Sequence, residues 1–172
     1  MQTDTAVECF TTAASLRAAP YELEWGASVF AQVLAINVYG DSDFSLEGNG
    51  AVIITSPGEP TALSEDAGGR AKTTLGLTWT APEFTGGDVI LDYRVNYRVL
   101  GGEFTPLASD VTETSYTAAG LSLGTQYEFR VESRNNYGYS LASSNTLLLL
   151  CAVAPEPPAT VQTSNFEDQV KL

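Results

Sequence analysis

Few side chains in this chain are suited to catalysis. Histidine is absent, which removes the usual general base and the partner of a Ser-His or Cys-His nucleophile pair. Two carboxylate pairs do occur, Glu22 with Glu24 and Glu128 with Glu132. Acid–base chemistry would need such a pair in a pocket, with neighbours that shift its pKa values. Because both pairs alternate along a strand or its approach, we interpret them as outward-facing residues and predict no catalytic residue and no enzyme.

Metal and cofactor chemistry finds little support either. Asp41 and Asp43 could help to bind calcium, which prefers clustered carboxylate oxygens, but one pair supplies too few ligands. We interpret this pair as a solvated loop. Cys9 and Cys151 are too far apart in sequence for a metal-binding pair and too few for a disulfide framework. We predict no metal and no cofactor. Whether the two thiols are free or cross-linked stays open, and for Cys151 we favour burial as a free thiol.

The charge balance excludes one class of partner. Eight basic and 21 acidic residues give a net charge of −13 among 172 residues, 44% of which are hydrophobic. Binding of DNA or RNA depends on Lys and Arg displacing counterions, so we predict no nucleic acid partner. The longest apolar run, residues 147–154, is far shorter than the ~20 residues of a membrane-spanning helix. The composition is that of a globular protein.

A shift of 98 residues aligns two stretches of the chain without a gap. Residues 23–45 then match residues 121–143 at a series of Leu, Gly, Val, Asn, Tyr-Gly and Ser positions, and Pro57 falls on Pro155. A third match begins where Pro158–Val161 aligns with Pro60–Leu63. We therefore predict three units: residues 1–56 as the C-terminal part of a repeat, residues 57–155 as a complete repeat, and residues 156–172 as the start of a further one.

Within the complete unit, apolar residues alternate with a period of two, which is typical of half-buried antiparallel strands. Glycine-rich turn signals separate these short strands, as at residues 67–69, 85–88 and 101–102. Strands and turns at this spacing predict a β-sandwich of ~100 residues. The alternating sets are Leu75, Leu77 and Trp79; Tyr93, Val95 and Tyr97; and Tyr127, Phe129 and Val131.

Three motifs together resemble the fibronectin type III family: Trp79-x-x-Pro82, then Gly86-Gly87-x-x-Ile90-x-x-Tyr93-x-Val95-x-Tyr97, then Leu121-x-x-Gly124-x-x-Tyr127-x-Phe129-x-Val131-x-x-x-Asn135. The resemblance implies an all-β, immunoglobulin-like sandwich in tandem repeats, with strands A, B and E facing C, C′, F and G. It also implies that Trp79 fills the core and that Tyr127 forms a tyrosine corner. The first copy has Val29 at that corner position.

Two surfaces are candidate interfaces. Strands C and F are neighbours in the implied fold, and alternation places Arg94, Arg98, Arg130 and Arg134 outward on them. We favour a cross-strand ladder in which Arg130 and Arg134 pair with Glu128 and Glu132 or with Asp92, and keep open a contact with an acidic neighbouring chain or a glycan. The first copy has Phe30, Leu34 and Ile36 at the equivalent outward positions, so its strand is apolar on both faces and predicts a covered surface.

Strand G extends this apolar character to a sheet edge. Leu148 and Leu150 lie in a run with neither charge nor proline before Pro155, the features that usually protect an edge strand. We therefore expect an exposed edge in a free monomer, and count Leu148 and Leu150 among the candidate interface residues.

These observations predict a structural module of a long tandem-repeat protein, extracellular or at the cell surface, that forms fibres through stiff proline-rich linkers and apolar sheet faces. Its predicted partners are neighbouring repeats, copies of the same protein and a glycan. The alternatives are a ligand-binding or adhesion module of a receptor-like protein, and an accessory domain of a secreted enzyme. Tyr137-Gly-Tyr-Ser and Gly48-Asn-Gly-Ala also resemble repeats in very long surface proteins of single-celled eukaryotes.

Overall fold

Seven antiparallel strands between residues 61 and 150 form two sheets that share one core. The structure is a computed structural model that describes residues 9–157, 160, 164–166 and 169–171. One sheet has the order β5-β6-β9 and the other the order β11-β10-β7-β8. This is the predicted arrangement of A, B and E against C, C′, F and G. The strands are β5 (Thr61–Ala71), β6 (Thr74–Thr80), β7 (Asp92–Val99), β8 (Thr105–Val111), β9 (Ser115–Ala118), β10 (Gln126–Arg134) and β11 (Leu147–Leu150).

The alternating apolar residues of both sheets make the core, as the period of two predicts. In β10, Tyr127, Phe129 and Val131 are buried while the residues between them are not. Trp79 is 4% exposed and meets the Tyr93 ring edge-on, with 5.4 Å between centroids. Such aromatic pairs add to the free energy gained by burial of their surface.

The expected tyrosine corner is present. The Ser122 backbone N–H donates to the Tyr127 hydroxyl oxygen at 3.0 Å, and the Tyr127 ring is buried. The bond ties the start of β10 to the turn that precedes it. Gly124 in that turn has a φ of 78°, a backbone conformation that favours glycine.

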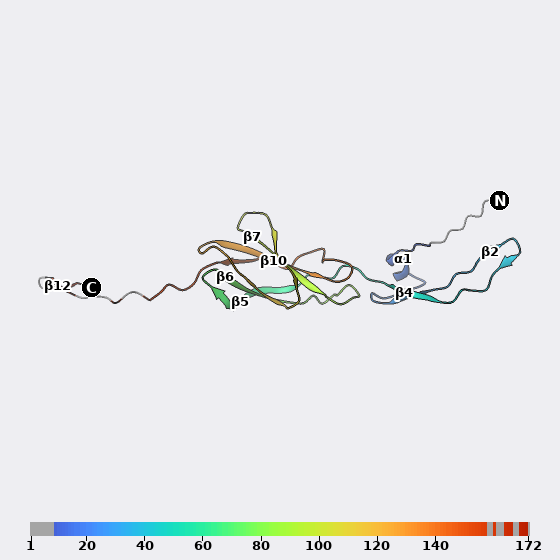
Figure 1. Cartoon of the computed structure of the whole chain (residues 1–172), viewed down its shortest axis with the longest axis horizontal. Coiled ribbons are helices and arrows are strands. Elements are labelled where there is room, and N and C mark those ends of the chain that lie inside the picture. The colour runs from blue at the N-terminus through green and yellow to red at the C-terminus, as the bar shows by residue number, and fades with distance from the viewer. Residues whose placement is uncertain (1–8, 158–159, 161–163, 167–168, 172) are drawn as a thin grey trace.

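Residues 9–56 form a short helix and a long hairpin that extends from one end of the sandwich (Figure 1). Helix α1 (Ala13–Arg17) begins after Thr12, whose side chain accepts a hydrogen bond from the Ser15 N–H. Strand β1 (Ser28–Ala31) pairs with β4 (Gly48–Val52), and β2 (Ile36–Asn37) pairs with β3 (Gly40–Asp41).

This hairpin repeats the β10–β11 hairpin at the 98-residue shift. Ser28 pairs with Val52 as Gln126 pairs with Leu150, and Ile36 pairs with Asp41 as Arg134 bridges to Tyr139. The turn before each hairpin is also the same. The N–H of Gly26 donates to the Ile53 carbonyl at 2.8 Å, and that of Gly124 donates to the Cys151 carbonyl at 2.7 Å.

The rest of the first copy differs from the complete unit. Residues 17–20 align with strand β9 at the 98-residue shift, but they form the end of α1 and a turn. The backbone groups of this segment are bonded locally: the Leu23 N–H donates to the Leu16 carbonyl, and the N–H groups of Tyr21 and Glu22 donate to the Ala18 carbonyl, each at 3.0 Å.

The predicted third unit is only partly described. Strands β12 (Ser164–Phe166) and β13 (Gln169–Lys171) pair antiparallel. Pro158, Val161 and Leu172, on which the prediction of this unit depends, lie outside the described residues.

Candidate interaction surfaces

The outer face of β7 and β10 carries a ladder of opposite charges. The strand register places Arg98 opposite Glu128 and Arg94 opposite Glu132. Each arginine Nε lies 2.6 Å from its glutamate oxygen. A cross-strand ladder is what we favoured from the sequence, but the glutamates have other partners than expected. Glu128 and Glu132 pair with Arg98 and Arg94 on β7, the residues directly opposite them, and not with the arginines of their own strand.

The ladder ends at Arg134, which binds two carboxylates. Its guanidinium donates twice to Asp92, the residue opposite it on β7, and lies 2.7 Å from Asp110. Asp92 is 6% exposed. The hydrogen bond to Asp92 raises the pKa of Arg134 well above its ordinary value. Both oxygens of the buried Asp92 carboxylate are therefore bonded to Arg134.

Two aromatic rings complete the face. Phe104 lies beneath both Arg98 and Arg130, whose guanidinium carbons are 4.4 and 4.3 Å from its centroid. Arg130 also donates to the Thr146 hydroxyl at 2.8 Å, and Arg94 lies 4.0 Å from the centroid of Tyr139. Because the arginines already contact carboxylates or rings of their own unit, the geometry favours the ladder. A partner for this face stays a prediction.

The first copy presents apolar side chains instead. Phe30 is 57% and Ile36 74% exposed, and Leu34 is partly buried. The opposite side is also uncovered, because Val33 is 69% exposed whereas its counterpart Val131 is fully buried. This hairpin therefore has no core of its own in the described chain.

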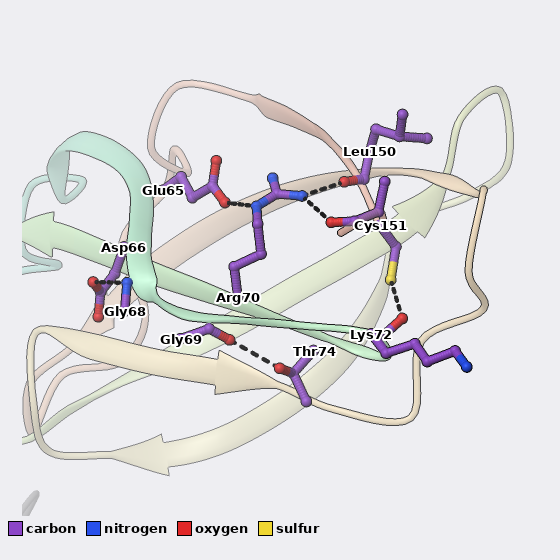
Figure 2. Close-up of polar contacts among 10 residues, drawn as sticks. Glu65, Asp66, Gly68, Gly69, Arg70, Lys72, Thr74, Leu150 and Cys151 are labelled. Atoms are coloured by element: carbon purple, nitrogen blue, oxygen red, sulfur yellow. Dashed lines mark hydrogen bonds and ion pairs between the residues drawn. The ribbon is translucent and has the colours of Figure 1, made fainter. Parts of the chain in front are cut away.

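Strand β11 lies at the edge of its sheet, as the sequence predicts, and its C-terminal end is held by a side chain of β5. Leu148 and Leu150 are about half exposed, but the Arg70 guanidinium reaches from β5 and donates to the carbonyls of Leu150 and Ala152 at 2.9 and 2.8 Å. Figure 2 shows this clasp, with the Arg70 Nε bound to Glu65. The charge that protects the edge comes from another strand, so inspection of strand G alone missed it.

Two further features hold the clasp in place. The hydrogen bond to Glu65 raises the pKa of Arg70 above its ordinary value, so the guanidinium stays charged. At the other end of β11, Asn145 exchanges two hydrogen bonds of 3.2 Å with the backbone of Leu63. Strand β5 thus secures both ends of this edge.

The cysteines follow the favoured interpretation. Cys151 is fully buried beside β5, and its thiol donates to the Lys72 carbonyl over 3.6 Å (Figure 2). Cys9 is exposed, and both thiols are free in the structure.

The hairpin and the sandwich meet at a junction built from two glycines. A Cβ atom at Gly87 would lie 2.9 Å from the Ile53 carbonyl oxygen and would also collide with Gly26. A Cβ atom at Gly86 would collide with the Thr55 carbonyl. Real Cβ atoms are not found so close to backbone, so glycine is required at both positions.

Hydrogen bonds and one aromatic pair close the same junction. The Thr55 N–H donates to the Gly86 carbonyl at 2.9 Å, and the Gly58 N–H donates to the Phe84 carbonyl at 2.8 Å. Trp25 meets the Phe84 ring edge-on at 6.4 Å and carries the guanidinium of Arg17 4.3 Å above it. Helix α1 therefore contributes to the junction through its last residue.

Asn135 joins three segments at this point. Its side-chain N–H groups donate to the carbonyls of Thr55 and Thr85 at 2.8 and 2.9 Å. Its side-chain oxygen accepts from the N–H groups of Tyr137 and Gly138. The amide is 2% exposed, with all of its hydrogen-bonding capacity used.

Sequence reasoning missed these junction residues. The sequence predicts only a turn at Gly86-Gly87, and it includes Asn135 only as one position of the family motif. Neither prediction places these residues at a junction. The available signal was that Trp25, a large aromatic residue, stands where the complete unit has Leu123. The loop aromatic Phe84 gave a second hint.

The described residues include no group of three or more Cys, Asp or Glu side chains placed to hold a metal ion. In the same part of the chain, no helix has the length and apolar character needed to cross a membrane.

Comparison with known proteins identifies the fold. A family model of the fibronectin type III domain matches residues 59–147, which is half of the chain. A titin homolog of Caenorhabditis elegans is 31% identical over 115 residues, which are 67% of this chain and 1% of that protein. Exoglucanase A of Cellulomonas fimi is 37% identical over 111 residues, which are 64% of this chain and 12% of that protein.

Among solved structures, the crystal structure of domains A168–A170 from titin matches with a TM-score of 0.61 and 24% identity. The match covers 76% of this chain and 43% of that one. The chain thus spans only a small part of the curated relatives that it matches. It belongs to the fibronectin type III family.

Proposed function

We propose that this fibronectin type III module is one stretch of a long tandem-repeat protein, in which successive units meet at fixed junctions and build an extracellular or cell-surface filament. The observation that carries the proposal is the contact of Gly26, Ile53 and Thr55 with Gly86 and Gly87. A flexible tether between units would not need backbone-to-backbone contact at two glycines.

The linker itself supports a fixed geometry. Pro57 and Pro60 are both buried, and the Gly58 N–H is bonded to the loop after β6. Proline restricts the backbone, and packing removes most of the remaining freedom. Each compact unit of this size would add roughly 30 to 40 Å to the length of an array.

The hairpin of residues 26–53 supports an array of like units. Its register, its turn hydrogen bonds and its glycine at the turn recur 98 residues later. In the complete unit, the equivalent hairpin lies against a second sheet. We propose that residues 1–56 are the C-terminal part of a preceding unit, and that its apolar residues Phe30, Leu34 and Ile36 contact copies of the same protein.

The names of two relatives keep two alternative functions open. Exoglucanase A is an enzyme by its name, which keeps an accessory domain of a secreted enzyme as the alternative. Ephrin type-A receptor 5 of Gallus gallus, 30% identical over 88 residues, keeps the receptor module as another. The charged face, occupied by its own carboxylates, favours neither. We propose no catalytic role for this chain.

Electron microscopy of the native parent particle, with an antibody against this chain as a label, tests the proposal. We expect filaments that carry the label at a regular axial spacing, with a repeat of roughly 30 to 40 Å per unit. Discrete particles with a saturable soluble ligand would support the receptor module instead. Labelled particles that hydrolyse a polymer would support the accessory domain.

A further inference from the structure

The end of the sandwich at Leu123 and Gly124 repeats the geometry of the surface that the first junction already uses. Gly26 and Gly124 have φ angles of 86° and 78°, and their N–H groups donate to the carbonyls of Ile53 and Cys151. The flanking strands have the same register. The two surfaces therefore have the same backbone conformation and hydrogen bonding where a partner would bind.

The two surfaces differ in what covers them. At Gly26, a Cβ atom would lie 3.0 Å from the Gly87 carbonyl oxygen, whereas at Gly124 the space is open to beyond 4 Å. Leu123, which aligns with Trp25 at the 98-residue shift, is 51% exposed. Val153, which aligns with Thr55, is 45% exposed. Leu123 and Val153, two apolar side chains, thus flank a glycine whose outer side is unoccupied in the described chain.

The hydrogen bonds of Arg70 hold this surface in one conformation. By binding the Leu150 and Ala152 carbonyls, Arg70 fixes the direction in which the chain leaves β11 toward Val153 (Figure 2). The thiol of Cys151, bonded to the Lys72 carbonyl, anchors the residue between them. A surface that is held in one conformation loses little entropy on binding.

We propose that Leu123, Gly124 and Val153 form a docking surface for a loop of the fibronectin type III unit that follows in the same chain. The loop must resemble Phe84-Thr85-Gly86-Gly87, with an aromatic residue two positions before a glycine pair. The aromatic ring would pack on Leu123 as Phe84 packs on Trp25. The second glycine would face Gly124 with no side chain between the backbones.

This inference depends on the proposed array but makes a separate claim. In the proposed array, units follow one another along the chain. The separate claim is that Leu123, Gly124 and Val153 of this unit hold the next unit of the same chain.

The test uses an extended chain in which residues 1–155 are followed directly by a second copy of residues 58–155. This continues the natural register, because Pro155 answers Pro57. The readout is the NMR signal of the Leu123 methyl groups in the monomer. We expect an upfield shift relative to the original chain, caused by the ring of the appended Phe84, and loss of that shift when the appended copy carries Phe84→Ala.

A matched pair of glycine variants in the appended copy separates docking from loop strain. Gly87 and Gly101 have φ angles of 84° and 83°, but only Gly87 would carry its Cβ into a neighbouring backbone. We expect Gly87→Ala to abolish the Leu123 shift and Gly101→Ala to preserve it. Unchanged Leu123 signals in the extended monomer, or a shift found only in dimers, would overturn the inference. Neither result would affect the labelling of filaments by electron microscopy.

Discussion

At the scale of single residues, Tyr127 links a buried ring to the backbone of the turn before its strand. Its hydroxyl oxygen accepts from the Ser122 N–H at 3.0 Å, and the ring is stacked with Tyr97, with 6.2 Å between centroids. The family resemblance predicted this bond, and the structure confirms it. Motif position alone was sufficient because the contact is local.

Tyr127→Phe tests the energetic weight of this corner. The substitution keeps the ring and leaves the Ser122 N–H without its partner, so we expect a loss of about 1 to 2 kcal/mol in the free energy of unfolding. Urea unfolding followed by tryptophan fluorescence measures it. Tyr137→Phe, on an exposed ring, is the control and should leave the midpoint unchanged. Equal stability of both variants would show that the corner bond contributes nothing.

Arg70 illustrates a residue whose role depends on tertiary structure. It lies on β5, but two of its acceptors, the carbonyls of Leu150 and Ala152, lie at the end of β11 and just after it, about 80 positions along the sequence. No pattern within β5 or β11 reveals that contact, which is why the edge of β11 looked unprotected in the sequence.

We expect Arg70→Met to make the chain self-associate through β11. The substitution frees the carbonyls of Leu150 and Ala152, while Leu148 and Leu150 already offer apolar surface. Sedimentation velocity over a range of concentrations should reveal a dimer. Lys72→Met removes the same charge from an exposed position nearby and should associate no more than the unsubstituted chain. An Arg70→Met variant that associates no more than the unsubstituted chain at any concentration would mean that the clasp does not protect the edge.

At the scale of elements, the period of two predicted β6, β7 and β10, because each of these strands has one face in the core, and the family resemblance implied the full set of seven strands. The period of two in residues 127–131 corresponds residue by residue to the burial in β10. The prediction was less complete for residues 9–27. Helix α1 forms there after the Thr12 cap, a local signal that the repeat alignment does not include.

Residues 1–56 alone should lack a cooperative unfolding transition. Among their described residues Ile53 is buried, and it packs at the junction with the sandwich. Two strands without a covering layer are marginal in water. Circular dichroism of the isolated peptide on heating measures this, with residues 57–155 as the comparison. A sharp two-state melt of the peptide would contradict the assignment of these residues as part of a unit.

The apolar hairpin face can be converted into its charged counterpart. Leu34→Glu with Ile36→Arg introduces the residue types that the complete unit has at Glu132 and Arg134. We expect weaker lateral association, because burial of each apolar side chain is worth about 1.5 to 3 kcal/mol. Light scattering of concentrated solutions follows the association, and the melt of the sandwich should be unchanged. Unaltered association would place the contact on another face.

At the scale of the whole molecule, the account depends on the junction between the hairpin and the sandwich. The sequence predicted that two units adjoin at a proline-rich linker, and it predicted stiffness from proline alone. The structure adds contacts that proline content does not predict: the Gly26–Gly87 approach, the Trp25–Phe84 pair and the amide of Asn135. These residues are distant in sequence, so only the fold brings them together.

Asp88 and Asn136 hold the two loops of the sandwich that receive the hairpin. The Asn136 side chain donates to Asp88 at 2.7 Å, and this bond lowers the pKa of the Asp88 carboxyl. The loops are therefore tied to each other as well as to the linker. A junction with this many partners is expected to orient both parts as one body.

Residual dipolar couplings of the full chain test this central claim most directly. One alignment tensor should fit the couplings of residues 26–53 and of residues 61–150 together. Gly87→Ala should require two tensors, whereas Gly101→Ala, with the same positive φ but open space around it, should still need one. Two independent tensors in the unsubstituted chain would contradict a fixed junction and, with it, the account of how this protein builds its length.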